Sequence, residues 1–327
     1  MRTAEFVTPK HPDKLCDIIS DSILDLFLVK DPYTQCSIQT MGGFGKIWVT
    51  GEIHTNVFIL DSEIKNLIKT ISGYTDIELH INQNPNKNPI KTNDQGIIIG
   101  YATTETKSKV PFEYELAREL CKYIYSIYPY DGKTQVTING TDAKVVASFQ
   151  NTKSEDLEKL VYSFFQTNSK KITNQLLKIS EIYCNPHGDW VIGSLDNDTG
   201  ISGAKNVIDN YGPRIPIGGG SFSGKDPSHI DRCGAYMARK IAIDSLIKYG
   251  LSYSLVELSY TMGNDTPIQA RIKGNDKGIN VETGVKLFEI TDYDLSINGI
   301  IDLLDLRKPI FKETTEWGPF GNNFYRK

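Results

Sequence analysis

Expected strands and helices alternate along this chain in an order that repeats about three times: a strand pair, a helix, a strand and a helix. The repeats have no clear residue-level similarity. Hairpins and helices segregated in this way indicate an α+β fold rather than a doubly wound parallel sheet. A chain of 327 residues also exceeds what one hydrophobic core usually fills, so two or three domains are expected.

Hydrophobic periodicity and turn signals place the individual elements. A hairpin is predicted from residue 37 with its returning strand at 46–53, and further strands at 97–103, 135–139, 144–149, 181–183, 190–192, 206–208, 257–261 and 268–272. Helices are predicted at 15–30, 61–71, 112–128, 154–166, 284–288 and 292–303. A long helix is expected to begin with Asp226 as N-cap and Pro227 as its first residue, and to end at Gly250. The Asn- and Pro-rich stretch 82–93 is predicted to be a loop or a short lid.

The first predicted helix carries acidic residues at i, i+4 spacing on the side opposite its apolar stripe. They are Asp13, Asp17, Asp21 and Asp25. Like charges so placed repel one another by roughly 0.2–0.5 kcal/mol per pair, so the last three are interpreted as a solvated face. Asp13 differs because it stands in the first turn beside His11 and Lys14, where the helix dipole favours an anion.

Two short segments, two hundred residues apart, combine cationic side chains with a carboxylate near a helix start. One is His11-Pro12-Asp13-Lys14, and the other, the glycine segment, runs from Gly218 to Arg232. These residues could hold polyphosphate and Mg²⁺. The glycine segment nearly spells a Walker A loop, but Asp226 stands where a Ser or Thr hydroxyl should bind magnesium. It therefore binds phosphate by another geometry or does not bind it.

The charge balance excludes some partners. With 36 basic and 40 acidic residues, a net charge of −4 and a pI near 5.8, nothing predicts a global attraction to nucleic acid or to an anionic membrane. The five scattered cysteines form no Cys-x-x-Cys, which argues against a disulfide framework or a zinc site. Without a signal peptide pattern or an apolar run of about 18 residues, the protein is expected to be cytoplasmic.

Several motifs, in order along nearly the whole chain, resemble those of the S-adenosylmethionine synthetase (methionine adenosyltransferase) family. They are His11-Pro12-Asp13-Lys14-Leu15-Cys16-Asp17, Asp94-Gln95-Gly96, Gly100-Tyr101-Ala102-Thr103, Asp131-Gly132-Lys133-Thr134-Gln135-Val136, the glycine segment, Leu304-Asp305 and Lys312-Glu313-Thr314. The resemblance implies three βαββαβ-like domains related by pseudo-threefold symmetry, here placed at 1–90, 91–193 and 194–327. It also implies a homodimer joined through its sheets, with a tetramer as the alternative, and active sites between subunits.

The implied reaction is attack of methionine sulfur on C5′ of ATP, release of triphosphate, and hydrolysis of triphosphate to pyrophosphate and phosphate. Sulfur needs no general base, so the barrier lies in the leaving group, whose growing negative charge must meet preplaced cations. By resemblance, the catalytic residues are His11, Lys133 and Lys225. The ATP and triphosphate contacts are His11, Asp131, Lys133, Trp190, Asp198, Lys205, Ser221, Lys225 and His229.

The same resemblance assigns the methionine and metal ligands. Methionine would contact Glu52, Asp94, Asp198 and His229. Asp13 and Asp231 would each hold one of two Mg²⁺ ions, which prefer oxygen ligands, and Gln39 stands where the family binds K⁺. Without the motifs, Lys205 would be read as a solvated residue and Trp190 as a core or interface residue.

The chain also departs from the family pattern. Where the family has an Arg-Lys pair that binds triphosphate, this chain has Ala204-Lys205. His229 stands in place of a family lysine, and Gln39 stands in place of a glutamate that binds potassium. Arg214 is the predicted substitute for the missing arginine. The gating loop is shortened to 82–93, where Gln83 or Pro89 takes the place of a methionine-contacting glutamine. Two alternatives stay open: a catalytically weakened paralogue that binds nucleotide or a partner subunit, and an NTPase that uses the glycine segment as a P-loop.

Overall fold

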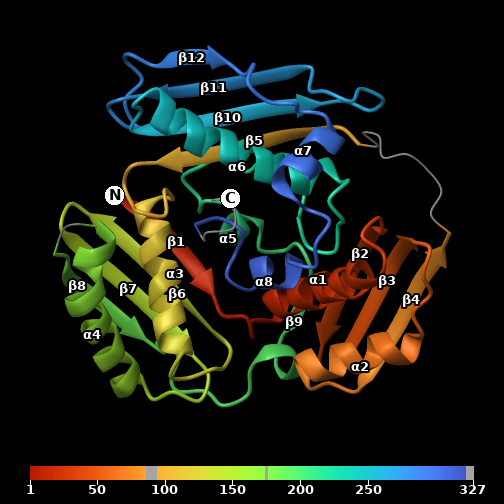
Figure 1. Ribbon diagram of the computed structural model, residues 1–327. Helices are drawn as coiled ribbons and strands as arrows, with labels where there is room; N and C mark the ends of the chain where they lie inside the picture. Colours follow the sequence, from red (N-terminus) through yellow and green to blue (C-terminus); the bar gives the residue numbers. More distant parts are fainter. Residues whose placement is uncertain (86–93, 174–175, 322–327) are drawn as a thin grey trace.

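The protein is represented by a computed structural model that describes residues 1–85, 94–173 and 176–321. Figure 1 shows three sheets arranged around a centre that holds the short helices α5 (Asn206–Asp209) and α8 (Phe311–Glu316). The fold is α+β with three sheet-containing domains, as predicted. In the described part of the chain, no helix has both the length and the apolar character needed to cross a membrane.

Two of the sheets share one strand pattern. From the edge strand inward, the first two pairs of neighbouring strands are antiparallel and the third pair is parallel. The first contains β1 (Arg2–Val7), β6 (Gly132–Asn139), β7 (Asp142–Phe149) and β8 (Lys178–Cys184), in that order. The second contains β9 (Thr199–Ile201), β2 (Gln35–Gly43), β3 (Lys46–His54) and β4 (Asp76–Asn84). The third, with β5 (Gly96–Thr103), β10 (Tyr253–Tyr260), β11 (Gln269–Asn275) and β12 (Lys286–Glu289), is wholly antiparallel.

Each sheet takes its edge strand from a distant part of the chain. Strand β1 joins strands from 132–184, β9 joins 35–84, and β5 joins 253–289. After each edge strand, the chain crosses to a helix that packs on a different sheet: α1 (Pro12–Lys30) after β1, α3 (Phe112–Tyr125) after β5, and α6 (Ile230–Lys248) after β9 and α5. Three equivalent crossovers result, and both charged motifs of the sequence lie in such crossovers.

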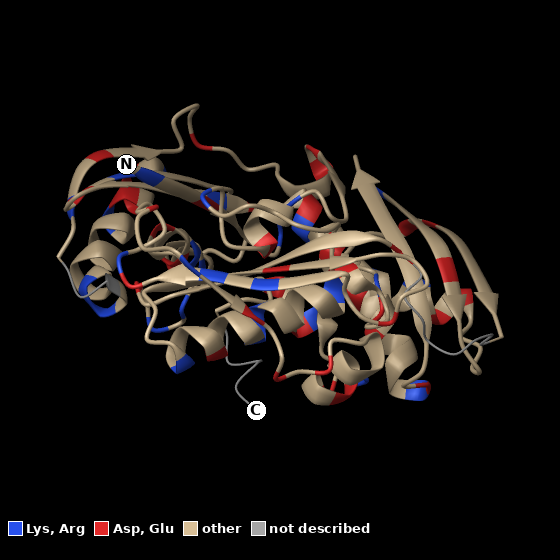
Figure 2. Ribbon diagram, turned by 90° about the horizontal axis from the view of Figure 1, so that it is seen from above, with Lys and Arg blue, Asp and Glu red and all other residues tan. Residues whose placement is uncertain are grey.

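The remaining helices complete the layers over the sheets. Helix α2 (Asp61–Ser72) packs against α1, α4 (Ser154–Thr173) against α3 and β8, and α7 (Ile297–Leu304) against α6. A 3₁₀ turn, η1 (Ser194–Asp196), contacts β2 and β9. Strand β6 shows the expected alternation, with Val136 buried between the exposed Gln135 and the partly exposed Thr137. In Figure 2, acidic and basic residues are interspersed over the fold, in keeping with the nearly balanced charge.

Most predicted elements are confirmed, but four predictions are wrong. Residues 190–192 form no strand, 206–208 belong to the helical turn α5, and 284–288 overlap strand β12 rather than a helix. The long helix α6 begins at Ile230 with His229 as its N-cap, not at Pro227 after Asp226. Strand β4 was not predicted, and its last residues overlap the proposed loop 82–93, of which 86–93 lie outside the described residues.

Candidate active site

The first charged motif forms the N-terminus of α1. The Nδ1 atom of His11, the N-cap, accepts a hydrogen bond of 3.3 Å from the backbone N–H of Asp13. The Asp13 carboxylate accepts from the Ile201 N–H at 2.9 Å and from the Lys205 ammonium at 2.5 Å. The crossover that contains β9 therefore brings Lys205 to the start of α1.

Burial and charge set the ionisation of this cluster. Burial, followed by the positive charge of Lys205, lowers the pKa of His11 to about 4, so the imidazole is neutral at pH 7. Burial alone would raise the pKa of Asp13, but the hydrogen bonds from Lys205 and Ile201 outweigh it and lower that pKa. The result is a neutral imidazole beside a carboxylate and an ammonium, all close enough to act on one ligand.

A second set of predicted residues lies within electrostatic reach of His11. Lys133 is exposed near the start of β6, and both Lys133 and Asp198 influence the pKa of His11. Asp131 is buried and accepts a 2.8 Å hydrogen bond from the Ser194 N–H, and its burial raises its pKa to about 6. The structure thus brings residues from three distant chain segments together here.

Trp190 borders this region on an irregular segment rather than a strand. Its ring contacts Gly193, and its Nε1–H donates to the Asn185 side chain at 3.4 Å. The indole is half-buried, so one part of the ring remains accessible.

The glycine segment builds a second ion pair. The Lys225 ammonium lies 2.5 Å from the Asp231 carboxylate, and the other oxygen of Asp231 accepts a 2.6 Å bond from the Gly220 N–H. A side chain on Gly220 would meet this pair, because its Cβ would lie 3.1 Å from both Lys225 Nζ and Asp231 Oδ2. Ser221 beside it packs against Gly203, two residues before Lys205.

Asp226 is not a helix cap. Its carboxylate is buried and accepts hydrogen bonds of 2.7 Å from the N–H groups of Cys36 on β2 and of Ser228. His229 lies 3.1 Å from the same carboxylate through Nδ1. Asp226 therefore fastens the glycine segment to β2, and this structural role explains a carboxylate at the position where a Walker A loop has a hydroxyl.

The interpretation of Asp17, Asp21 and Asp25 as a solvated face is wrong. Asp17 lies 3.1 Å from the buried Lys14 and accepts from the Gly203 N–H at 2.7 Å. Asp21 is fully buried, and Asp25 accepts hydrogen bonds from the first two N–H groups of α8, those of Phe311 and Lys312. The side of α1 that looked solvent-facing is covered by the glycine segment and by α8.

The remaining predicted site residues are less constrained. Glu52 and Asp94 are exposed, Glu52 lying 3.5 Å from the imidazole of His54. Gln39 accepts a 2.8 Å hydrogen bond from the Ser202 hydroxyl. No group of three or more His, Cys, Asp or Glu side chains within the described ranges is arranged to hold a metal ion.

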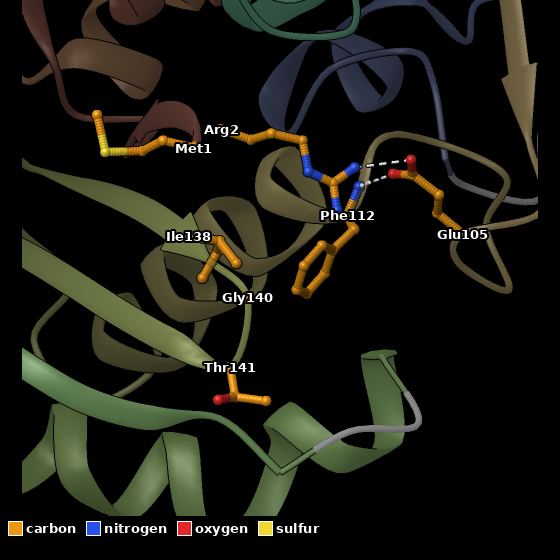
Figure 3. A pocket seen from close by; sticks show the side chains of 7 residues that line it. All are labelled: Met1, Arg2, Glu105, Phe112, Ile138, Gly140 and Thr141. Carbon is orange, nitrogen blue, oxygen red and sulfur yellow. Dashed lines mark hydrogen bonds and ion pairs between the residues drawn. The ribbon is translucent and has the colours of Figure 1, made fainter. Parts of the chain in front are cut away.

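Arg214, the predicted substitute for the missing arginine, is engaged by two glutamates. Its guanidinium is held by Glu113 at 2.8 Å and by Glu105 at 3.1 Å. Glu105 also pairs with Arg2 at 2.7 Å at a cavity of about 560 Å³ between the start of β1, the β6–β7 turn and α3, shown in Figure 3. None of the residues that line this cavity is a predicted site residue.

Comparison with known proteins places this arrangement in a family. The N-terminal, central and C-terminal domains of S-adenosylmethionine synthetase match residues 1–96, 89–190 and 192–327. The chain belongs to the S-adenosylmethionine synthetase family. It is 33% identical to the S-adenosylmethionine synthase of Clostridium tetani, over 98% of this chain and 93% of that protein. It is 31% identical to that of Sulfurovum sp., over 98% and 92%.

A solved structure supports the same assignment. It is described as an unusual S-adenosylmethionine synthetase from Campylobacter jejuni, is 26% identical, and superposes with a TM-score of 0.84 over 100% of this chain and 96% of that one. As a family member, the chain is a methionine adenosyltransferase that makes S-adenosylmethionine from ATP and methionine. The family uses divalent metal cations.

The structure adds residues to the neighbourhood of the site to which the sequence assigned no role there. Asp21, Arg232 and Thr315 form a buried cluster beneath Lys225. The sequence signals were the acidic spacing in the first helix and the place of Arg232 at the end of the glycine segment, and neither can reveal partners nearly 300 residues away.

Proposed function

We propose that this enzyme forms S-adenosylmethionine by direct attack of methionine sulfur on C5′ of ATP, with intact triphosphate as the leaving group. The proposal rests on two lysines that are each held by a carboxylate. The Lys205 ammonium lies 2.5 Å from Asp13, and the Lys225 ammonium lies 2.5 Å from Asp231. Such cations, fixed before the reaction, can meet negative charge as it develops on the leaving triphosphate.

His11 is the residue we assign to the bridging oxygen. Because its Nδ1 accepts the Asp13 N–H, a neutral imidazole carries its proton on Nε2 and can donate it as a hydrogen bond. Lys133 would bind the phosphate chain beside it, and Lys205, Lys225, Ser221 and His229 would bind further along. Trp190 would stack on adenine, with Asp131 and Asp198 as polar contacts to the nucleotide.

The donor set suits magnesium. Asp13 and Asp231 offer carboxylate oxygens, which Mg²⁺ prefers, and Mg²⁺ commonly takes one or two protein carboxylates together with substrate phosphates. We propose two ions per site, one on each aspartate, which neutralise phosphate charge when bound. Both carboxylates already face a cationic group, so each can exchange an ammonium for a metal ion without burying an unpaired charge. Gln39 supplies an amide oxygen where K⁺ would bind.

We further propose that the active site forms between two subunits of a homodimer, which either stands alone or is half of a tetramer, and that the sheets make the contact. In support, Met41 and Ile201 are paired on neighbouring strands and each is 47% exposed. Methionine would be bound by Glu52, Asp94, Asp198 and His229, of which Glu52 and Asp94 are exposed. Domains at 1–90, 91–193 and 194–327, and a cytoplasmic location, complete the proposal.

Incubation with ATP, methionine and Mg²⁺ tests the chemistry directly. We expect S-adenosylmethionine, pyrophosphate and phosphate, at least about a hundredfold less product with Lys133→Met, and little change with Lys144→Met, an exposed lysine of the same sheet. If ATP is bound but no product forms, the chain is instead a weakened nucleotide-binding paralogue. This alternative is supported by His229, whose imidazole is paired with the Asp226 carboxylate instead of being free to bind substrate.

A further inference from the structure

Lys225 lies in the glycine segment, between β9 and α6, outside the helices and strands. It precedes α6 by five residues and forms an isolated bridge with Ser37, and the carbonyl of the preceding Gly224 accepts a 2.9 Å hydrogen bond from the Ile38 N–H of β2. Its ammonium nevertheless has to sit within bonding distance of Asp231 and, under the proposed function, of triphosphate. The bonds to β2 hold the residues on either side of Lys225, and the carbonyl of Lys225 itself is bonded by a side chain.

Arg232, in the first turn of α6, makes that contact. Its side chain is fully buried, and one guanidinium nitrogen donates a 2.6 Å hydrogen bond to the backbone carbonyl of Lys225. A second nitrogen bonds the carboxylate of Asp21 on α1 at 2.6 Å. The guanidinium also lies over the ring of Phe311, 4.5 Å from its centroid. A planar guanidinium can serve these partners at once, whereas an ammonium cannot.

Asp21 binds the same stretch of backbone from the other side. Its carboxylate accepts a 2.8 Å hydrogen bond from the Gly224 N–H and another from the Thr315 hydroxyl of α8. Gly224 has φ +76°, and a Cβ there would lie 2.0 Å from the Ile38 carbonyl oxygen. The Gly224–Lys225 backbone is thus pressed against β2 and bonded at both ends by one buried ion pair.

A buried ion pair of this kind is a poor source of stability, because desolvating both charges offsets most of their attraction. Its directional bonds instead select one conformation of the segment. We propose that Arg232, anchored by Asp21, is a positioning residue that holds Lys225 in place to bind triphosphate. This rests on the proposed role of Lys225.

The experiment compares two arginines of one helix. Arg232→Lys keeps the positive charge beside Asp21 but loses the second guanidinium nitrogen, which donates to the Lys225 carbonyl. Arg239→Lys is the matched control, because Arg239 is equally buried on α6 and bonds the carbonyls of Tyr101, Ser108 and Lys109, away from the glycine segment. Inorganic tripolyphosphate with Mg²⁺ is the probe, with S-adenosylmethionine formation and KM for methionine measured alongside, below the Tm of both variants.

We expect Arg232→Lys to lower kcat for tripolyphosphate hydrolysis by at least about tenfold with KM for methionine unchanged, and Arg239→Lys to stay within about twofold. Equal losses in both variants, or none in Arg232→Lys, would overturn the proposal. If Arg232→Lys does not fold, Thr315→Val, which removes only a donor to Asp21, decides: a loss of two- to fivefold supports the proposal and an unchanged rate overturns it.

A double variant separates this proposal from the proposed function. If Arg232 acts through Lys225, adding Arg232→Lys to Lys225→Met should lower the rate no further, because interacting residues are non-additive. Multiplying losses would overturn the positioning role while leaving the role of Lys225 intact. A Lys225→Met enzyme with wild-type triphosphate turnover would instead overturn the role of Lys225 itself.

Discussion

The Nδ1 atom of His229 lies 3.1 Å from the buried carboxylate of Asp226. His229 therefore faces the carboxylate that fastens its own segment to β2. Burial by itself would lower the pKa of His229, but the negative charge of Asp226 outweighs it and raises that pKa above its usual 6.5. Asp226 in turn has a lowered pKa, because the His229 charge and its hydrogen bonds outweigh burial.

This pair should make stability depend on pH near neutrality. Because the folded pKa of His229 is raised, its contribution is fully present below about pH 6.5 and is lost as pH rises through the folded value. We expect His229→Gln to reduce the free energy of unfolding by about 1 kcal/mol at pH 6 and by less at pH 9. Denaturant unfolding measures this, with the exposed His187→Gln as control. A difference that stays constant with pH would contradict it.

The titration of His229 should also affect the pH dependence of activity. In His229→Lys the titrating imidazole is replaced by an ammonium, so the pH profile of S-adenosylmethionine formation should lose the step that His229 contributes above pH 6.5. Initial rates between pH 6 and 9 test this. Identical profiles for the two enzymes would mean that His229 does not titrate during the reaction.

Ala204 is exposed next to Lys205, and Arg214 is engaged by Glu105 and Glu113. An arginine restored at Ala204 should therefore add charge-assisted bonds to triphosphate, worth roughly 1.5–3 kcal/mol each before losses from flexibility. We expect Ala204→Arg to raise triphosphate affinity by about tenfold or to speed its hydrolysis. Product inhibition by tripolyphosphate measures the change, and Ala204→Gln is the uncharged control. Unchanged inhibition with an unchanged rate would argue against the idea that triphosphate binding is weakened by the lack of an arginine at position 204.

The sequence predicted the helices and strands that have a clear apolar period, and it failed where distant chain segments decide the outcome. The run 190–192 is apolar enough for a strand, yet Val191 and Ile192 are 70% and 59% exposed. Its carbonyls bond the side chain of Gln150 and the N–H of Asn151 rather than a neighbouring strand. Strand β12 forms because β11 offers a free edge, which no local pattern reveals.

The site was predictable to the extent that its residues lie in motifs. The motifs identified His11, Asp13, Lys225 and Asp231, and the structure brings each aspartate to a lysine. Local spacing could not show that Asp21 is buried, since its partners come from α6 and α8. Asp226 looked like a cap for the same reason, because its bond to the Cys36 N–H depends on β2.

The neutral state of His11 leads to a further prediction. Burial and then Lys205 lower its pKa to about 4, so its charge should not change between pH 5.5 and 8. We expect His11→Asn to reduce kcat for S-adenosylmethionine formation by about 10²–10³, the usual cost of removing a donor to a developing anion. The kcat/KM profile of the wild-type enzyme should show no step of His11 near 6.5. A step near 6.5 that disappears in His11→Asn would contradict the assigned neutral donor.

Metal dependence tests the exchange of Lys205 for magnesium at Asp13. Chelation by EDTA should abolish product formation, and Asp13→Asn should raise the Mg²⁺ concentration for half-maximal rate by at least about tenfold, because an amide is a weaker ligand than a carboxylate. Asp31→Asn is the control, since Asp31 is a buried carboxylate that likewise accepts backbone hydrogen bonds, from Tyr33 and Asn56. An Mg²⁺ requirement equal in both variants would mean that Asp13 serves only to hold Lys205.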